Sequence, residues 1–157
     1  MLIIKQSIVV KFDILGKLYI IILTKEGIIM FGEKSILGQS ICTIDYKNRI
    51  ILPKFTNAEE GDNLIVVDEI DFLSIYKEDT YMKKILLLEE KIKNSNSIDE
   101  LRKNNLKLLL GYRTILKKVV CDKQHRINLG KIETDTNEIM CIGANDHLII
   151  QAKKRRN

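Results

Sequence analysis

Apolar and polar residues alternate in the middle of the chain. Residues 41–44 and 49–52 each have the period of a half-buried strand. Residues 45–48 between them are turn-forming, and Pro53 ends regular pairing because it has no backbone donor. The pattern predicts a β-hairpin over residues 41–52.

A similar alternation occurs again later in the chain. It belongs to a repeated motif, D-x-x-x-R-I-x-L-x-K, at residues 45–54 and 122–131. Five side-chain types recur in one register, which indicates two copies of one supersecondary unit. Each copy precedes two further strand-like segments, at residues 64–67 and 71–76, and at 139–142 and 146–151. Side chains of a strand alternate between faces. The expected inward residues are Ile50, Leu52, Ile127 and Leu129, and the outward ones are Arg49, Ile51, Arg126 and Asn128.

The region between the motifs has helical periodicity. Asp79 or Thr80 can cap a first helix, in which apolar residues recur every three to four positions. Ser97 and Glu100 form a capping box for a second helix, which we expect to stop at Gly111. We expect the leucines of this helical hairpin to be core, packed over the sheet or against a neighbouring subunit.

Residues 1–29 differ from the rest. Residues 8–14 and 18–23 are rich in β-branched residues and predict a hairpin. Charged residues interrupt the apolar runs, so neither a spanning helix nor a signal peptide is expected. The segment is either an added hairpin or sequence that lies upstream of the true translation start, which would then be Met30.

Charge is unevenly distributed along the 157 residues, whose net charge is +5. Residues 102–131 contain many lysines and arginines and a single acid, Asp122, whereas in residues 59–100 aspartates and glutamates outnumber lysines. A further basic cluster occupies residues 153–156. Such a distribution favours a polyanion such as nucleic acid as partner, the alternative being a solvated surface.

Three cysteines, Cys42, Cys121 and Cys141, form no C-x-x-C pair and are too few for a disulfide framework. They favour a reducing cytoplasm and buried apolar roles over metal binding or redox chemistry.

Each motif places an aspartate four residues before its arginine, across a turn. The carboxylate can accept turn amides or orient the guanidinium. Asp45 and Arg49 form the first such pair, and Asp122 and Arg126 the second. The alternative is a turn-stabilising ion pair that binds no ligand.

In these features the chain resembles the MraZ family, which belongs to the AbrB-like (SpoVT-AbrB) swapped-hairpin group of bacterial DNA-binding proteins. The likeness lies in the paired motifs, in Leu52-Pro53, in the helical insert and in residues 102–131, and it covers residues 30–151. It implies an α+β, mainly β fold: two AbrB-like swapped-hairpin repeats forming one small barrel, with a helical hairpin between them. The implied parts are an N-terminal extension at 1–29, a first repeat at 40–78, a helical insert at 79–111, a second repeat at 112–152 and a basic tail at 153–157.

The resemblance also implies a cytoplasmic, nucleoid-associated transcription regulator. Such a protein binds promoter repeats of double-stranded DNA as a homo-oligomer, in the form of a ring, and usually represses the division and cell-wall gene cluster. The implied DNA-binding residues are Arg49 and Arg126, with Lys47, Lys123, Lys54 and Lys131 beside them, and Asp45 and Asp122 support the motifs.

The chain departs from the family pattern before each arginine, where glycine is usual. Asn48 and His125 stand there, and Asn adopts left-handed geometry more readily than His. Gly130 replaces a usual proline in the second copy. These changes affect how the arginines are aimed, and so the target sequence, more than the fold.

Two other classes of function stay open. An AbrB-like antitoxin would bind and neutralise a toxin partner and regulate its own operon. An enzyme is not expected, because the sequence has no nucleophile triad, phosphate loop or metal-ligand spacing. We likewise expect no cofactor, no metal and no membrane partner.

Overall fold

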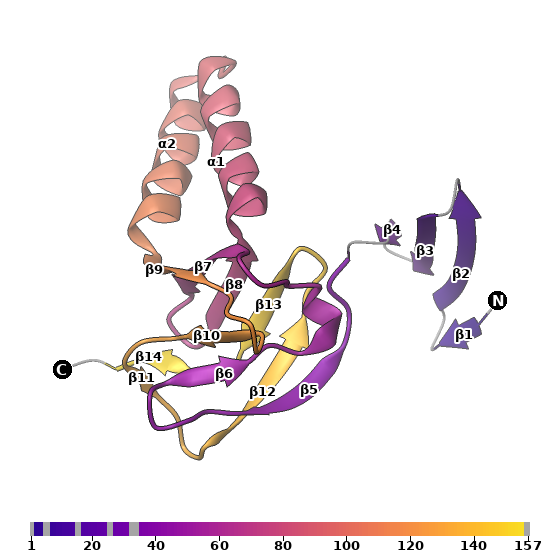
Figure 1. The fold of residues 1–157 in the computed structure, drawn as a ribbon. Helices are drawn as coiled ribbons and strands as arrows, with labels where there is room; N and C mark the ends of the chain where they lie inside the picture. The colour runs from indigo at the N-terminus through magenta and orange to yellow at the C-terminus, as the bar shows by residue number, and fades with distance from the viewer. Residues whose placement is uncertain (1, 5–6, 15–16, 25–26, 32–34, 156–157) are drawn as a thin grey trace. The chain divides into compact units, whose positions relative to one another are not determined.

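The chain is α+β and mainly β, as the sequence predicts. The computed structural model describes residues 2–4, 7–14, 17–24, 27–31 and 35–155 (Figure 1). They belong to two compact units, Met1–Ser35 and Ile36–Asn157.

The first unit is a four-stranded antiparallel sheet in the order β1-β2-β3-β4. Its strands are β1 (Leu2–Ile4), β2 (Ser7–Ile14), β3 (Lys17–Thr24) and β4 (Gly27–Phe31). β2 and β3 are the two strands of the expected hairpin, whose turn residues 15 and 16 lie outside the described residues. The sheet continues to residue 31, so this unit is longer than the expected extension of 29 residues.

The second unit contains a six-stranded antiparallel sheet in the order β5-β12-β13-β8-β7-β9. The strands are β5 (Gln39–Thr43), β7 (Asn63–Asp68), β8 (Leu73–Lys77), β9 (Ile115–Val120), β12 (Glu138–Gly143) and β13 (His147–Ile150). The motif strands β6 (Arg49–Ile51) and β10 (Arg126–Asn128) pair with each other, and β11 (Ile132–Glu133) pairs with β14 (Lys153–Lys154). A 3-10 helix, η1 (Lys54–Thr56), follows the first motif.

The two repeats are related by an approximate two-fold axis. Exchanging them swaps β5 with β9, β12 with β7, and β13 with β8, which leaves the strand order of the sheet unchanged. The central pair of the β6–β10 ribbon joins the equivalent residues Ile50 and Ile127. At the centre of the large sheet, Ser74 is likewise opposite its equivalent, Ile149.

The expected single closed barrel is not present among the described residues. The large sheet ends at β5 and β9, which do not pair with each other. Each motif turn interrupts the ladder, so the chain leaves the sheet and the motif strand joins a separate two-stranded ribbon. The expected β5–β6 hairpin is accordingly reduced to one bridge, between Ile44 and Ile50, and the main partner of β6 is β10.

The main core lies between the large sheet and the ribbon. The predicted inward residues are all buried there: Ile50, Leu52, Ile127 and Leu129. Arg49 and Ile51 lie on the other face, and Ile51 is 59% exposed. The alternation read from the sequence is therefore confirmed in both motifs.

A smaller core covers the opposite face of the sheet at the base of the helices. It joins Ile65, Val67 and Tyr76 of the sheet to Tyr81 and Ile85 of the first helix. Since β7 and β8 are covered on both faces, their residues 64–67 and 73–76 are all buried. Burial on both faces explains why apolar and polar residues do not alternate along these two strands.

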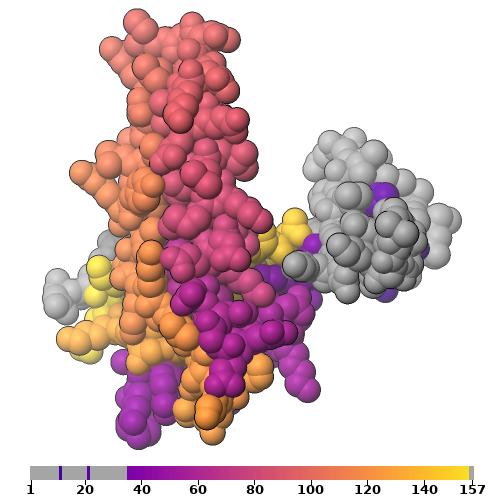
Figure 2. Space-filling view, turned by 45° about the horizontal axis from the view of Figure 1, so that its top comes forward, coloured from indigo at the N-terminus to yellow at the C-terminus, as the bar shows by residue number. Residues whose placement is uncertain are grey.

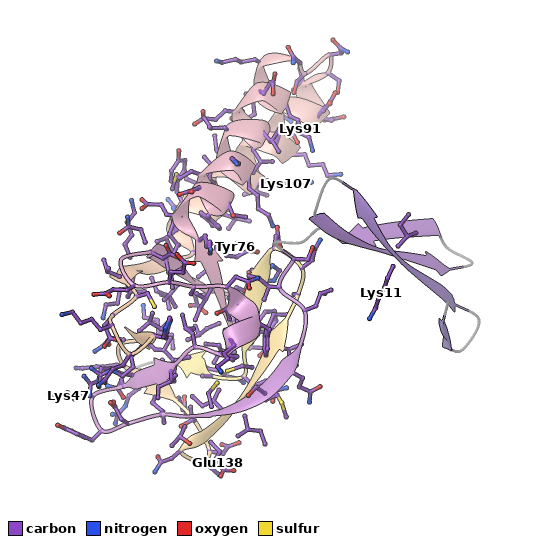
Figure 3. The ribbon with its side chains drawn as sticks, turned by 45° about the vertical axis from the view of Figure 1, so that its right-hand side comes forward. Lys11, Lys47, Tyr76, Lys91, Lys107 and Glu138 are labelled. Carbon is purple, nitrogen blue, oxygen red and sulfur yellow. The ribbon has the colours of Figure 1, made fainter. Side chains whose placement is uncertain are left out.

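Polar contacts add to this packing (Figure 3, where Tyr76 is labelled). The Tyr76 ring stacks on His147 at 4.6 Å, and Lys84 Nζ lies 2.9 Å from Asp146 and 4.8 Å from the centre of the Tyr76 ring. His147 is the first residue of β13.

The helical insert is α1 (Glu78–Lys93) followed by α2 (Ile98–Arg113), which extend together from the sheet (Figure 1). α1 begins at Glu78, so the predicted caps at Asp79 and Thr80 are wrong, and its N-cap Lys77 provides no side-chain hydrogen bond. The predicted cap of α2 is confirmed, because Ser97 Oγ accepts a hydrogen bond from the Glu100 amide at 3.1 Å. None of the helices described is long and apolar enough to cross a membrane.

α2 continues through Gly111, so the predicted stop there is wrong. A Cβ at this position would lie 2.9 Å from Ile85 Cδ1, and Tyr81 Oη donates a hydrogen bond to the Gly111 carbonyl. The glycine therefore permits close approach of α1 to α2.

Many leucines of the helices are exposed rather than buried within this chain. The exposed apolar residues of α1 and α2 are Leu86, Leu87, Ile98, Leu101, Leu106, Leu109, Leu110 and Tyr112. These residues do not pack over the sheet, since only the base of the pair reaches the smaller core, and their expected packing against a neighbouring subunit stays a prediction. Figure 2 shows the helical pair extending well beyond the sheet.

We expect Ile50→Ala to lower the free energy of unfolding by about 2–5 kcal/mol, because it leaves a cavity in the core. Ile51→Ala changes the next, exposed residue of the same strand and should stay within about 0.5 kcal/mol of the wild type. Urea unfolding followed by circular dichroism measures both. Equal losses would show that the two faces of β6 are not differently buried.

Candidate nucleic-acid interface

The first motif turn is organised by one carboxylate. Asp45 Oδ1 accepts hydrogen bonds from the amides of Lys47 at 2.9 Å and Arg49 at 3.0 Å. Asp45 Oδ2 accepts from Arg49 Nε at 2.8 Å and lies 2.7 Å from its Nη2. The backbone closes the turn through the Asn48 amide, which donates to the Asp45 carbonyl at 3.0 Å. One side chain thus fixes the turn and the guanidinium together.

The second turn repeats this geometry. Asp122 Oδ1 accepts from the amides of Gln124 and Arg126, both at 2.8 Å, and Oδ2 accepts from Arg126 Nε at 2.7 Å. The His125 amide donates to the Asp122 carbonyl at 3.0 Å. The two uses considered for the aspartate, accepting turn amides and orienting the guanidinium, therefore occur together in both copies.

Asn48 and His125, the residues before the two motif arginines, both occupy left-handed positions. Their φ angles are 60° and 58°. Asn tolerates this region well, whereas His does so at some cost. The His125 ring also contacts a backbone carbonyl, with Nδ1 3.1 Å from the Ala58 oxygen, so Nδ1 must be the protonated donor there. Both turns therefore adopt the left-handed geometry without a glycine.

The pairing of β6 with β10 brings the two turns together. The Leu52 amide donates to the His125 carbonyl and the Leu129 amide to the Asn48 carbonyl, each at 2.8 Å. These bonds are equivalent under the two-fold relation. Each turn is therefore tied to the end of the other repeat's motif strand.

Both arginines are partly exposed. The side chains of Arg49 and Arg126 are 24% and 28% exposed, and those of Asp45 and Asp122 are 33% and 37% exposed. Water screens such ion pairs, so they add little stability, and orientation is their main effect. Within residues 35–155, no other group pairs with either guanidinium. Each guanidinium therefore retains N–H donors for a ligand.

The predicted lysines lie around the ribbon and are all exposed: Lys47, Lys54, Lys123 and Lys131. Lys47 is near the tip of the first turn and points away from the body, on the side remote from the helices (Figure 3). Lys54 and Lys131 stand at equivalent places just after the two motif strands. The basic tail is adjacent, because the Arg155 amide donates to the Lys131 carbonyl at 3.2 Å.

The tail is therefore not a free extension over its first residues. Lys153 and Lys154 form β14, which pairs with β11, and Lys153 Nζ lies 3.5 Å from Asp71. Residues 156 and 157 lie outside the described residues.

Sequence reasoning did not assign a role to Asn128 or Lys117. Asn128 occupies the outward position equivalent to Ile51, and its Oδ1 accepts from Lys117 Nζ at 3.1 Å and from the Gly130 amide at 2.8 Å. Its Nδ2 donates to the Lys47 carbonyl at 3.0 Å, which ties β10 to the first turn. A comparison of the two motifs could have identified Asn128, because it is polar whereas the equivalent residue of the first motif is Ile51.

An acidic loop at residues 59–62 lies beside the start of the second motif. Its Gly61 amide donates to the Cys121 carbonyl at 2.9 Å, immediately before the second motif. Burial first, then Asp122, Asp62 and Glu60, raise the pKa of the Cys121 thiol. Acidic side chains of this loop therefore lie close to the start of the second motif.

The motif hydrogen bonds also act on the carboxylates. Desolvation raises the pKa of Asp45, but hydrogen bonds from Arg49 and Lys47 outweigh it, and the pKa is lowered overall. Hydrogen bonding from the Arg126 amide is the largest cause of the lowered pKa of Asp122. Both carboxylates therefore remain ionised and keep their arginines oriented at neutral pH.

Within the described part of the chain, no three His, Cys, Asp or Glu residues are grouped as a metal site would require. The arrangement at the ribbon provides oriented cations and exposed amines, which suit a polyanion. A scan against protein-family models finds no match, and a search of curated protein sequences finds none either.

We expect Asp45→Asn combined with Asp122→Asn to lower the thermal unfolding midpoint at pH 7 and to lessen its dependence on acid. A lowered folded pKa means that the aspartates stabilise the protein fully above their usual pKa of about 4. This contribution is lost as pH falls through the lower folded value. Calorimetry from pH 7 to pH 3 measures both proteins, and a gap that widens towards acid would contradict the expectation.

Proposed function

We propose that this protein is a sequence-specific, double-stranded DNA-binding transcription regulator of the AbrB-like swapped-hairpin group, similar to the MraZ family. The observation that supports it most is the β6–β10 ribbon, in which each repeat lends its motif strand to the other. Two oriented arginines thereby lie on one connected surface. A regulator of this kind acts by binding a promoter and excluding polymerase, with no catalytic step.

The ribbon has side chains suited to reading bases. A two-stranded β-ribbon fits the major groove, where arginine pairs bidentately with guanine. The carboxylate contacts limit the rotation of each guanidinium, which lowers the entropy lost on binding. The exposed lysines around the ribbon contact phosphates and set register without reading sequence.

A single chain would bind DNA weakly, because it neutralises few phosphates. We therefore infer a homo-oligomer, in ring form as in the related family, whose subunits bind successive promoter repeats together. The exposed leucines of α1 and α2 support an oligomer. Leu106, Leu109 and Leu110 lie one turn apart on α2 and are 58%, 46% and 50% exposed.

The same leucines favour a second candidate function, that of an AbrB-like antitoxin. An apolar helical surface is a typical binding site for a partner protein. On this alternative, the ribbon would regulate the protein's own operon while the helices neutralise a toxin. The repressor proposal adds the division and cell-wall gene cluster as target and a nucleoid-associated, cytoplasmic location.

We expect Arg49→Ala combined with Arg126→Ala to abolish preference for a duplex from the protein's own upstream region over scrambled DNA. Wild-type affinity should fall steeply with salt, and the variant should lose at least tenfold in affinity, because direct base contacts are removed. Fluorescence anisotropy across a salt series measures both quantities.

Arg102→Ala combined with Arg113→Ala is the matched control, since it removes the same charge from exposed sites on α2. It should lower affinity slightly and leave sequence preference intact. If the motif variant binds as well as wild type while folded, the motifs are structural turns and the proposal fails.

We expect Leu106→Glu combined with Leu110→Glu to dissociate the oligomer, because two buried charges would oppose an apolar interface. Lys103→Glu with Lys107→Glu introduces the same residues at exposed polar sites of α2 and should leave assembly unchanged. Sedimentation velocity measures the mass. A wild type that sediments as a monomer would argue against self-association and turn attention to a different protein partner.

A further inference from the structure

Two buried thiols meet across neighbouring strands of the large sheet. Cys42 lies on β5 and Cys141 on β12, and their Sγ atoms are 3.0 Å apart. Cys42 is opposite Ile139 and Cys141 opposite Ser40, so the two side chains are diagonal neighbours on the core face. The distance is about 1 Å longer than a disulfide bond.

We propose that Cys42 and Cys141 are an oxidation site, at which a peroxide converts the thiol pair into a reversible disulfide between the two repeats. The sequence favoured small apolar roles for these cysteines, and the geometry adds a chemical role. This inference does not depend on DNA binding.

The chemistry needs a peroxide and no other reactant. The Cys42 thiolate attacks one oxygen of hydrogen peroxide and breaks the O–O bond, which gives a sulfenic acid and hydroxide. The Cys141 sulfur then attacks the Cys42 sulfur and releases the sulfenic oxygen as water. Its thiol proton leaves with that water, and two electrons have passed from the sulfurs to the peroxide. A dithiol reductant reverses the change by thiol–disulfide exchange.

Position and electrostatics assign the first step to Cys42. β5 is an edge strand of the sheet, and Cys42 is 7% exposed, whereas Cys141 is fully buried on an interior strand. The hydrogen bond from the Cys141 thiol lowers the pKa of Cys42, and the same contact, followed by burial, raises that of Cys141. A thiolate forms more readily at the accessible member of the pair, and the buried one resolves the sulfenic acid.

The positions equivalent to Cys42 and Cys141 show whether packing alone requires cysteine there. The equivalents of Cys42 and Cys141 under the two-fold relation are Val119 and Val66, which are buried to the same extent. Valines therefore satisfy the packing requirement, and Cys42→Val with Cys141→Val should fold normally. Cys121 is buried too but has no thiol neighbour among the described residues, so it serves as an internal control.

The test treats the full-length native protein with hydrogen peroxide, blocks free thiols with iodoacetamide in denaturant, and analyses a non-reducing digest by mass spectrometry. We expect a peptide that joins Cys42 to Cys141, about 2 Da lighter than the two free peptides together, with Cys121 alkylated. Dithiothreitol should restore both thiols. The oxidised wild type and the Cys121→Ala variant should gain several degrees in unfolding midpoint, since the link closes a long loop.

The Cys42→Val, Cys141→Val variant should show no peroxide-dependent gain. The proposal is overturned if all three cysteines remain alkylatable after peroxide, if Cys42 proceeds to sulfinic acid without a link, or if the link joins Cys121 or a second chain. It is also overturned if the link forms only in denaturant, because the native geometry would then have no part in it.

Discussion

The pairing of β6 with β10 is the constraint on which the rest of the structure depends. Each motif strand is three residues long, and β6 makes a single bridge to its own repeat, between Ile50 and Ile44. Its ladder partner is the motif strand of the other repeat, and the turn amides and carbonyls extend that exchange. The ribbon closes the main core by burying Ile50 and Ile127. The candidate interface therefore exists only when both repeats are folded together.

Within that frame, local chemistry sets the details. An aspartate that caps its own turn also fixes the arginine four residues later, so turn geometry and side-chain orientation have one cause. The second copy reaches the same geometry with different residues, since His125 adopts the left-handed position and contacts Ala58. The surface around the motifs differs more than the motifs do, because Asn128 replaces Ile51 and an acidic loop lies beside the second turn. The backbone of the ribbon is therefore symmetric, whereas the side chains around its two halves differ.

Features that depend on neighbouring residues could be predicted from the sequence. The strand alternation at Ile50 and Ile127, the aspartate–arginine contacts and the Ser97 cap all follow from short-range geometry. Features set by distant contacts could not. The sequence pattern does not indicate which strands join the large sheet. It predicts a helix stop at Gly111, since the contact with Ile85 that requires this glycine comes from another helix. The leucines of α2 were expected to be buried because periodicity identifies an apolar face without identifying what covers it.

The strand order of the large sheet has a consequence for synthesis. β5 lies beside β12, and residues in contact across that pair, such as Cys42 and Cys141, are 99 positions apart. The first repeat emerges from the ribosome with both β5 and β6 lacking their partners. At ordinary rates of translation, those partners follow on the order of ten seconds later. During that interval the nascent chain exposes unpaired strand edges, so its vulnerability to aggregation is set by the topology rather than by its final stability.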